Sequence, residues 1–395
     1  MSSVEACHAG GIEENRRRIG GSRCGAGESG SQPRRALLEN LEAGRERGCG
    51  CLSMHGSECF EECRRKLTLQ CRTVNRRHSA PPRIGHTGRY LEMAENGSVT
   101  IEGVEITHAD KPLYSGKGRT KLDLARYYAE ISKWILPHLR QRLVSLVRCP
   151  EGWRGECFYQ RHPSDSLPDE IRTRTVREKN GERAGYLQIG DVAGLVAGVQ
   201  VGALEFHIWG SRTDRLERPD RLVFDLDPGS GTGFARVREA ARDLHALLQE
   251  LDLESFVMTT GGEGVHVIVP IERRSSWDDA RDFTRACAQR LARQKPEAYV
   301  VEASREKRAG KVFIDYLRNS RGNTAICPYS LRRHRGAPVA TPIRWDELAR
   351  LECSNAWHLG NIRARLAALK SDPWRGASPL RQRLGMRRMR AVGCR

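Results

Sequence analysis

The stretch RLVFDLDPGSGTGFARVREAARDLHALLQELDLESFVMTTGGEGVHVIVP, residues 221–270, decides the fold class. Residues 221–227 form a short apolar run that ends in an Asp-Pro-Gly turn signal, as a buried strand does. Residues 234–251 predict an amphipathic helix, because their apolar side chains recur at helical spacing. Two more strands, 255–260 and 265–270, flank a Gly-Gly-Glu-Gly turn. The succession of strand, helix, strand and strand predicts an α+β fold.

Patterns typical of strands and helices continue on both sides of this stretch. Residues 99–106 alternate between apolar and polar side chains, which indicates a strand. A capping-box pattern at Thr120 predicts a helix that runs from there to about residue 140. Residues 277–294 predict a further helix and residues 311–317 a further strand. Together these elements predict one folded domain over residues 98–375.

The two ends of the chain differ from this domain. Residues 1–97 are rich in Gly, Ser, Arg and Glu with little apolar periodicity, so we expect them to be mostly disordered, apart from a helical fragment over 34–47. Residues 376–395 predict a basic, disordered tail that is attracted to phosphates. Four cysteines of the first region are an alternative zinc site, although their spacing is not that of paired C-x2-C motifs: Cys49, Cys51, Cys59 and Cys63.

Composition narrows the possible partners. The net charge of +18 suggests a polyanion, most often nucleic acid, although an Arg-rich codon bias is the alternative. We find no signal peptide and no apolar run long enough to span a membrane, so the expected location is the cytoplasm. An odd number of cysteines, 13, in such a chain does not predict a disulfide framework.

Three acids are candidate metal ligands. Asp225 and Asp227 are two apart on one strand and therefore face the same way, and Asp315 lies in another apolar strand. Buried carboxylates of this kind need a cation between them, and oxygen ligands favour Mg²⁺ or Mn²⁺. Such a site catalyses in-line phosphoryl displacement. The alternatives are a solvated strand end that leads into a turn and, for Asp315, a structural cap.

The glycine turn is a candidate phosphate-binding loop. Gly261 and Gly262 expose backbone N–H groups that can hold phosphate oxygens, and His266 on the following strand can donate to the same phosphates. The alternative for His266 is a buried histidine satisfied within the core.

Several blocks of residues 99–375 resemble the polymerase domain of bacterial DNA ligase D, a member of the archaeo-eukaryotic primase superfamily. The blocks are THADKPLY, TKLDLARYY, ILPHLR, VRCPEGWRGECFYQRH, LEFHIWGSR, RPDRLVFDLDPG, TTGGEGVH, FIDYLRN and APV. The resemblance implies a primase-polymerase fold, with an RRM-like antiparallel catalytic sheet and a second, small α/β module. No K-x-D-G ligase motif accompanies these blocks, so the chain resembles a polymerase domain that is free-standing or detached from its ligase.

The resemblance also implies roles for individual residues. Asp225, Asp227 and Asp315 match the family's catalytic acids, which hold two divalent ions, with Mn²⁺ usually preferred over Mg²⁺. The residues that match the binding site of the incoming nucleotide are His207, Thr260, Gly261, Gly262, His266, Arg308 and Arg332. The residues that match DNA-binding positions are the aromatic pair Phe158 and Tyr159 for template bases, Lys111 and Lys121 for a 5′-phosphate, and Arg148 and Arg161.

Departures from the family pattern concern charge. Glu263 stands where the glycine turn usually carries Lys, which places a negative charge near a tetra-anionic ligand. Met258 also stands where Lys is common, and His108 where Asn is. The three metal-binding acids are intact.

The expected function is template-dependent addition of NTPs or dNTPs to a primer 3′-OH, for gap filling and end processing in non-homologous end joining. Expected partners are DNA with gaps or broken ends carrying a 5′-phosphate, a Ku-type end-binding protein and a DNA ligase; a membrane is not expected, and the protein would associate with the nucleoid. Two alternatives stay open: a non-catalytic module that binds and pairs DNA ends, and a de novo primase of a mobile element.

Overall fold

The computed structural model describes residues 98–117, 119–377 and 380–394. The predictions for residues 1–97, including the helical fragment and the four-cysteine cluster, lie outside these residues. In the described ranges no helix is long and apolar enough to cross a membrane.

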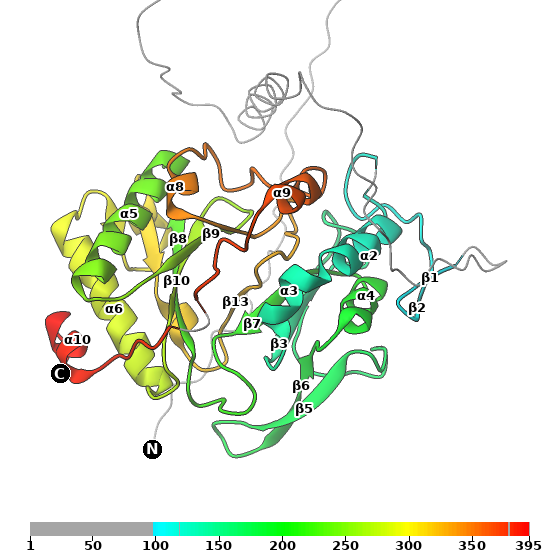
Figure 1. The fold of residues 1–395 in the computed structure, drawn as a ribbon, viewed down its shortest axis with the longest axis horizontal. Helices are drawn as coiled ribbons and strands as arrows, with labels where there is room; N and C mark the ends of the chain where they lie inside the picture. Colours follow the sequence, from blue (N-terminus) through cyan, green and yellow to red (C-terminus); the bar gives the residue numbers. More distant parts are fainter. Residues whose placement is uncertain (1–97, 118, 378–379, 395) are drawn as a thin grey trace, which may run out of the picture. The chain divides into compact units, whose positions relative to one another are not determined.

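Two six-stranded sheets organise the described chain (Figure 1). The first sheet has the strand order β13-β7-β3-β6-β5, and β4 pairs with β3 beside this path. Its strands are β3 (Val144–Arg148), β4 (Phe158–Gln160), β5 (Arg172–Arg177), β6 (Arg183–Gln188), β7 (Ala203–Trp209) and β13 (Thr324–Ile326). Its pairings are all antiparallel.

The second sheet has the order β11-β12-β8-β10-β9-β14 and is antiparallel except for the β11–β12 pair. Its strands are β8 (Arg221–Pro228), β9 (Phe256–Thr259), β10 (Val265–Pro270), β11 (Tyr299–Val300), β12 (Val312–Asp315) and β14 (Thr341–Ile343). The predicted strand 221–227 is therefore confirmed as the central strand β8.

Each sheet has its own helices. The first is covered by α2 (Lys121–Glu130), α3 (Ser132–Leu139) and α4 (Val192–Gln200). The second is covered by α5 (Phe234–Glu250) and α6 (Trp277–Gln294), whose bounds confirm the predicted helices. The remaining elements are β1 (Val99–Ile101), β2 (Val104–Ile106), α7 (Arg305–Arg308), η1 (Leu317–Asn319), α8 (Trp345–Leu348), α9 (Ile362–Ala368) and α10 (Met386–Ala391).

Alternation along β8 separates core from site. Leu222, Phe224 and Leu226 are fully buried in the core formed with α5 and α6. Successive side chains of a strand point to opposite faces, so Asp225 and Asp227 lie on the face away from these helices. The apolar face thus anchors the strand that carries two of the predicted catalytic acids.

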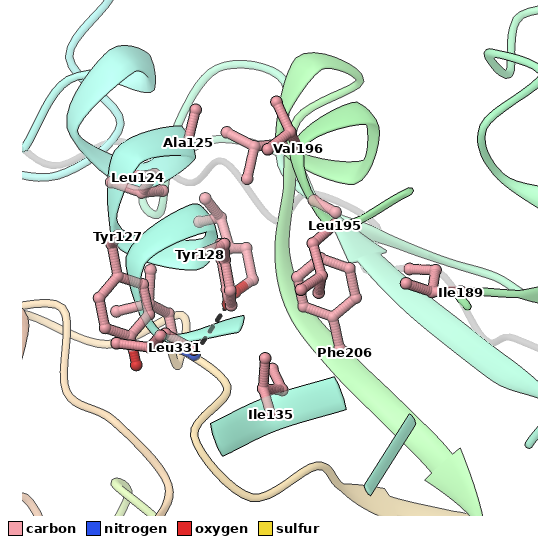
Figure 2. Close-up of a cluster of buried hydrophobic side chains, with 14 of the residues drawn as sticks. Leu124, Ala125, Tyr127, Tyr128, Ile135, Ile189, Leu195, Val196, Phe206 and Leu331 are labelled. Carbon is pink, nitrogen blue, oxygen red and sulfur yellow. Dashed lines mark hydrogen bonds between the residues drawn. The ribbon is translucent and has the colours of Figure 1, made fainter. Parts of the chain in front are cut away.

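The core of the first sheet packs around two tyrosines of α2 (Figure 2). Tyr128 stacks edge-on against Phe206 of β7, with ring centroids 4.9 Å apart. Its buried hydroxyl accepts a hydrogen bond from the Leu331 N–H at 2.9 Å and donates to the Leu204 carbonyl. Tyr127 donates to the Tyr329 carbonyl at 2.7 Å. These bonds tie α2 to the segment that follows β13.

Two predicted elements are each divided in the structure. The predicted helix over 120–140 is α2 and α3, with a break at Ile131, whose backbone departs from helical geometry at φ −92° and ψ 8°; Pro137 lies further on, inside α3. The predicted strand over 99–106 is the hairpin β1–β2, because Glu102 and Gly103 both adopt positive φ and form its turn.

The C-terminal segment differs from the predicted disordered tail. Residues 380–394 include α10, and Val392 is buried against the core of the second sheet. The Gln382 side chain donates to the carbonyls of Glu254 and Pro270 and accepts from the Glu254 N–H. A few apolar and polar anchors between arginines are enough to order this segment.

The structure contains a disulfide that the cysteine count did not predict. Cys149 and Cys157 form a disulfide with an S–S distance of 2.06 Å. Counting cysteines could not reveal this pair, because the two partners meet through the β3–β4 pairing.

Candidate active site

The predicted catalytic acids lie on neighbouring strands of the second sheet. Asp225 on β8 is directly opposite Asp315 on β12 and directly opposite His266 on β10. Asp227 follows two residues further along β8 on the same face. Antiparallel pairing therefore brings together four side chains that are up to 90 positions apart in the sequence.

An arginine lies among these carboxylates. The Arg318 guanidinium approaches Asp225 Oδ2 at 3.0 Å from Nη2, and its Nε lies 3.5 Å from Asp315 Oδ2. Sequence reasoning missed this residue. The signal was its position three residues after Asp315, which the turn η1 folds back toward the acid.

Burial and mutual repulsion shift the pKa values of the acids. Burial and the charge of Asp225 raise the pKa of Asp227 to about 7. Burial, with a contribution from Asp225, also raises the pKa of Asp315 against the opposing charge of Arg318. For Asp225, burial acts in the same direction, but His266 and Arg318 outweigh it and hold the pKa below its usual range. The site therefore has more negative charge than the nearby arginines compensate.

The chemistry of the acids fits a divalent cation. Asp225 Oδ1 is buried and lies 3.2 Å from His266 Nε2, yet it accepts no hydrogen bond from any described residue. An orphaned carboxylate oxygen next to an acid with a raised pKa is a position where a cation lowers the free energy. No group of three or more His, Cys, Asp or Glu side chains in the described ranges is arranged to hold a metal ion. Arg318 contacts both Asp225 and Asp315.

The glycine turn between β9 and β10 adjoins the acids. The Thr260 hydroxyl donates to the Gly264 carbonyl at 2.9 Å and accepts from the Gly262 N–H, so it closes the turn. A Cβ at Gly264 would lie 2.7 Å from Asp227 Oδ1, so only glycine lets the turn approach β8 this closely. Glu263, the departure from the family pattern, is exposed to solvent.

Arg332 links the two sheets beside this turn. Its Nη1 donates to the Thr260 carbonyl at 3.0 Å, and its Nε donates to Glu205 Oε1 on β7 at 3.1 Å. Glu205 also contacts His207, with Oε2 2.7 Å from Nε2. Burial lowers the pKa of His207, although Glu205 opposes the shift. The structure thus brings three of the predicted nucleotide-binding residues together through Glu205, which the sequence did not single out.

Arg308 approaches the acids from the end of α7. Its guanidinium lies over the Phe313 ring, 3.6 Å from the centroid. Its charge opposes the rise in the pKa values of Asp227 and Asp315. Its buried Nε donates to no described residue.

The predicted template-binding aromatics lie on β4. Phe158 is 46% exposed and Tyr159 is 64% exposed, and they are two of only four large apolar side chains exposed in the described chain. Arg148 lies over the Phe158 ring at 5.3 Å, and Tyr159 contacts His207 edge-on. Arg161 is exposed just beyond β4. Both aromatic side chains are therefore accessible to bases, and Tyr159 adjoins the predicted nucleotide site through His207.

The predicted 5′-phosphate lysines lie together where α2 begins. The Lys121 N–H donates to the Lys111 carbonyl at 2.9 Å, and burial, with repulsion from Lys111, lowers the pKa of Lys121 to about 8. Repulsion between two adjacent ammonium groups favours an anion between them. The partner of Lys111 in this structure is Glu151, at 2.8 Å.

Comparison with known proteins agrees with this geometry. The family described as the LigD primase-polymerase domain matches residues 120–374. The multifunctional non-homologous end joining protein LigD of Pseudomonas aeruginosa is 39% identical over 319 residues, which cover 80% of this chain and 38% of that protein. The bifunctional LigD of Bacillus subtilis is 30% identical over 260 residues, which cover 66% of this chain and 42% of that protein.

A solved structure extends the agreement to the fold. The polymerase domain of Mycobacterium tuberculosis ligase D, in complex with DNA, matches with a TM-score of 0.64 and 31% identity. The match covers 70% of this chain and 98% of that one. The chain spans about two fifths of the length of the two curated relatives named above.

The family model and the solved structure give the class, that of the DNA polymerase/primase-type nucleotidyltransferases. Within that class, the chain belongs to the LigD primase-polymerase domain family. The resemblance seen in the sequence and the predicted α+β fold are therefore both confirmed.

Proposed function

We propose that this chain adds nucleotides to a primer 3′-OH on a DNA template by metal-dependent phosphoryl transfer. The observation that carries the proposal is the group of Asp225, Asp227 and Asp315 on adjacent strands, with an orphaned oxygen on Asp225 and a raised pKa on Asp227. Asp225 is paired with Arg318 and His266, but a purely structural cluster would not leave two further buried acids, Asp227 and Asp315, with raised pKa values.

Asp225, Asp227 and Asp315 would hold two Mn²⁺ or Mg²⁺ ions. When bound, such ions stabilise the attacking and leaving oxygens of an in-line displacement at phosphorus. The incoming triphosphate would lie against the turn N–H groups, His266, Arg308 and Arg332, whose charges oppose its own.

The sugar and the template would be bound by the first sheet. His207, held by Glu205, would lie beside the sugar of the nucleotide. Phe158 and Tyr159 would stack on template bases, because every base presents a π-face. Lys111 and Lys121 would bind the 5′-phosphate across a gap, which fits end processing during the repair of double-strand breaks.

The names of the relatives support a role in non-homologous end joining. A Ku-type end-binding protein and a DNA ligase are the proposed partners, and the nucleoid is the proposed location. The exposure of Glu263 supports catalysis over the non-catalytic alternative, because a solvated charge disturbs the triphosphate little.

A primer-extension assay tests the proposal. The substrate is a gapped duplex with a 5′-phosphate, supplied with Mn²⁺ and with NTPs or dNTPs in separate reactions. We expect extension by the wild type and none by the Asp225→Ala/Asp227→Ala double variant. Asp278→Ala, which removes an exposed acid on α6, is the matched control and should extend normally.

Three outcomes would change the conclusion. Tight binding that depends on the 5′-phosphate, without extension, would favour a module that only holds DNA ends. Strand initiation without a primer would favour a primase. Extension by the double variant would remove the acids from the mechanism.

A further inference from the structure

The Cys149–Cys157 disulfide closes the hairpin that carries the exposed aromatic pair. Cys149 follows Arg148 at the end of β3, and Cys157 precedes Phe158 at the start of β4. Arg148 and Phe158 are the last paired residues of the two strands. The disulfide therefore joins the two residues that lie just beyond the last β3–β4 pair.

Besides the disulfide, β4 is held by a short pairing with β3 and by side-chain contacts with Arg148 and His207. It has three residues, it pairs with β3 and no other described strand, and its two aromatic side chains are largely exposed. A short edge strand without a buried face is among the least stable parts of a fold. The covalent link is thus a major constraint on the position of Phe158 and Tyr159.

The loop between the two cysteines also packs on the predicted 5′-phosphate segment. The Trp153 N–H donates to the Leu113 carbonyl at 2.9 Å, and a Cβ at Gly152 would lie 2.9 Å from the same oxygen. Glu151 in this loop forms the ion pair with Lys111. One cross-link therefore supports both surfaces that the proposed function assigns to DNA.

We propose that Cys149 and Cys157 are a reversible thiol–disulfide site whose oxidised form orders the DNA-binding face and whose reduced form loosens it. The proposal rests on the proposed function, because it takes Phe158 and Tyr159 to contact DNA. The oxidant is a low-molecular-weight disulfide, RSSR.

The chemistry balances through two exchanges. Cys149 is fully buried and Cys157 only partly, so the Cys157 thiolate attacks RSSR first, forms a mixed disulfide and releases one RS⁻, which takes up the thiol proton. The Cys149 thiolate then attacks Cys157 Sγ and releases the second RS⁻. The two protein thiols lose two electrons and two protons, and RSSR becomes two RSH. Excess dithiol reverses both steps.

Peptide mapping tests whether the site exists. Arg148, Arg154 and Arg161 place the two cysteines on separate tryptic peptides, CPEGWR and GECFYQR. After treatment with oxidised glutathione, the full chain should yield these peptides as one disulfide-linked species, and after dithiothreitol it should yield them separately. Failure to find the linked species would overturn the proposal.

Limited proteolysis tests the loosening without DNA. Cleavage after Arg154 in the folded protein should be faster for the reduced form, because the loop then opens more often. The Cys149→Ser/Cys157→Ser variant should be cleaved at the fast rate under both conditions. Equal rates for the oxidised and reduced wild type would contradict the proposal.

Fluorescence anisotropy with a labelled, gapped DNA tests the consequence. We expect the oxidised protein to bind about fivefold more tightly than the reduced protein, since the aromatic pair no longer has to be ordered on binding. The double serine variant should bind weakly in both states, and Cys394→Ser, which leaves the pair intact, should respond like the wild type.

A further variant separates this proposal from the proposed function. Tyr159→Ala should lower the affinity of the oxidised protein and reduce the difference between the two states. If Tyr159→Ala binds DNA like the wild type while the affinity still changes with oxidation, the stacking role fails and the redox site stands. If the affinity does not respond to oxidation, the redox proposal fails, whatever the polymerase assay shows.

Discussion

The ionised form of Asp227 destabilises the folded protein. Its pKa is raised to about 7 by burial and by the neighbouring carboxylates, so the folded chain binds a proton there more tightly than the unfolded chain does. This acid therefore lowers the stability of the native state as the pH rises from the unfolded value of about 4 through 7, and the full penalty is present above that range.

Asp227→Asn should accordingly stabilise the protein when a chelator is present. We expect the free energy of unfolding at pH 8 to increase by about 1–2 kcal/mol, less than the full pKa shift implies because solvent screens part of the charge. At pH 4.5 the increase should be small. Urea unfolding at the two pH values measures it, with Asp214→Asn, an exposed acid, as the control. A variant that is less stable than the wild type at pH 8 would contradict the interpretation.

In the proposed nucleotide site, Glu205 would position Arg332 and His207. It is 4% exposed, and it binds Arg332, His207 and the Arg333 N–H. Glu205→Gln keeps the shape but removes the charge, so Arg332 and His207 lose charge-assisted bonds. We expect the KM for the nucleotide to rise about tenfold with a smaller change in kcat.

Steady-state primer extension at varied nucleotide concentration measures this effect. Glu250→Gln, at an exposed position on α5, should leave the KM unchanged. Equal losses in kcat and in kcat/KM, with no change in KM, would place Glu205 in the chemical step instead.

The sequence was enough to propose the candidate site residues, but not the side chains that contact them. The acids, His266 and the glycine turn could be found because carboxylates in apolar strands and glycines between strands are unusual. Arg318 and Glu205 could not, because an arginine in a basic chain and a glutamate on an alternating strand carry no local signal. Only strand pairing shows that Arg318 contacts an acid 93 positions away.

The β9–β10 turn shows how one element constrains another. A Cβ at Gly264 would lie 2.3 Å from the Leu226 carbonyl oxygen, closer than any relaxation of a side chain can relieve, so β10 would have to move away from β8. The acids and the glycine turn would then separate.

Gly264→Ala should therefore destabilise the protein by about 2–3 kcal/mol and also abolish primer extension. Thermal unfolding and the extension assay measure the two effects. Gly233→Ala is the control, because its Cβ meets no described atom within 4 Å, and its cost should be below about 1 kcal/mol. A Gly264→Ala variant as stable as the wild type would show that the turn is adaptable.

Elements with strong periodicity were predicted well, and those with local exceptions were not. The helices α5 and α6 have clear apolar stripes, and their predicted and observed bounds agree within one residue. The hairpin β1–β2 was predicted as one strand because each half alternates, although the alternation changes phase at the Glu102-Gly103 turn, where Ile101 and Val104 are three residues apart.

A buried ion pair, Arg142–Asp220, joins the two sheets. Arg142, 1% exposed, binds both oxygens of Asp220 at 2.8 and 2.6 Å, and it also donates to the Trp209 carbonyl at the end of β7. Asp220 directly precedes β8. The pair therefore fixes the position of the first residue of β8 relative to the first sheet.

Arg142→Met should cost about 3 kcal/mol of unfolding free energy, at the low end for a broken buried pair because Arg212 and Arg221 still contact Asp220. Adding Asp220→Leu should deepen the loss, because Arg212 and Arg221 then lose their carboxylate partner as well. Denaturant unfolding measures both variants. Arg236→Met, from an exposed pair on α5, should cost less than about 1 kcal/mol, and an equal cost for the two arginines would contradict the role given to Arg142.

The arrangement of the sheets was beyond sequence reasoning without the family resemblance. Strand patterns predicted β8, β9, β10 and β12, but no local pattern shows that β13 leaves the second sheet to pair with β7. Long-range pairing depends on the free energy of the whole assembly, which a window of residues does not contain.

The pairing of β13 with β7 has a consequence while the chain is being synthesised. All seven residues of β7 are buried in the finished protein, and one edge of the strand is paired only by Thr324–Ile326. A nascent chain that already includes β3 and β7 therefore exposes an apolar strand edge until more than a hundred further residues have been translated. Such an edge pairs readily with other chains. We expect ribosome-bound chains of this length to be strong chaperone substrates, and slow codons before Thr324 to lower the yield of active protein.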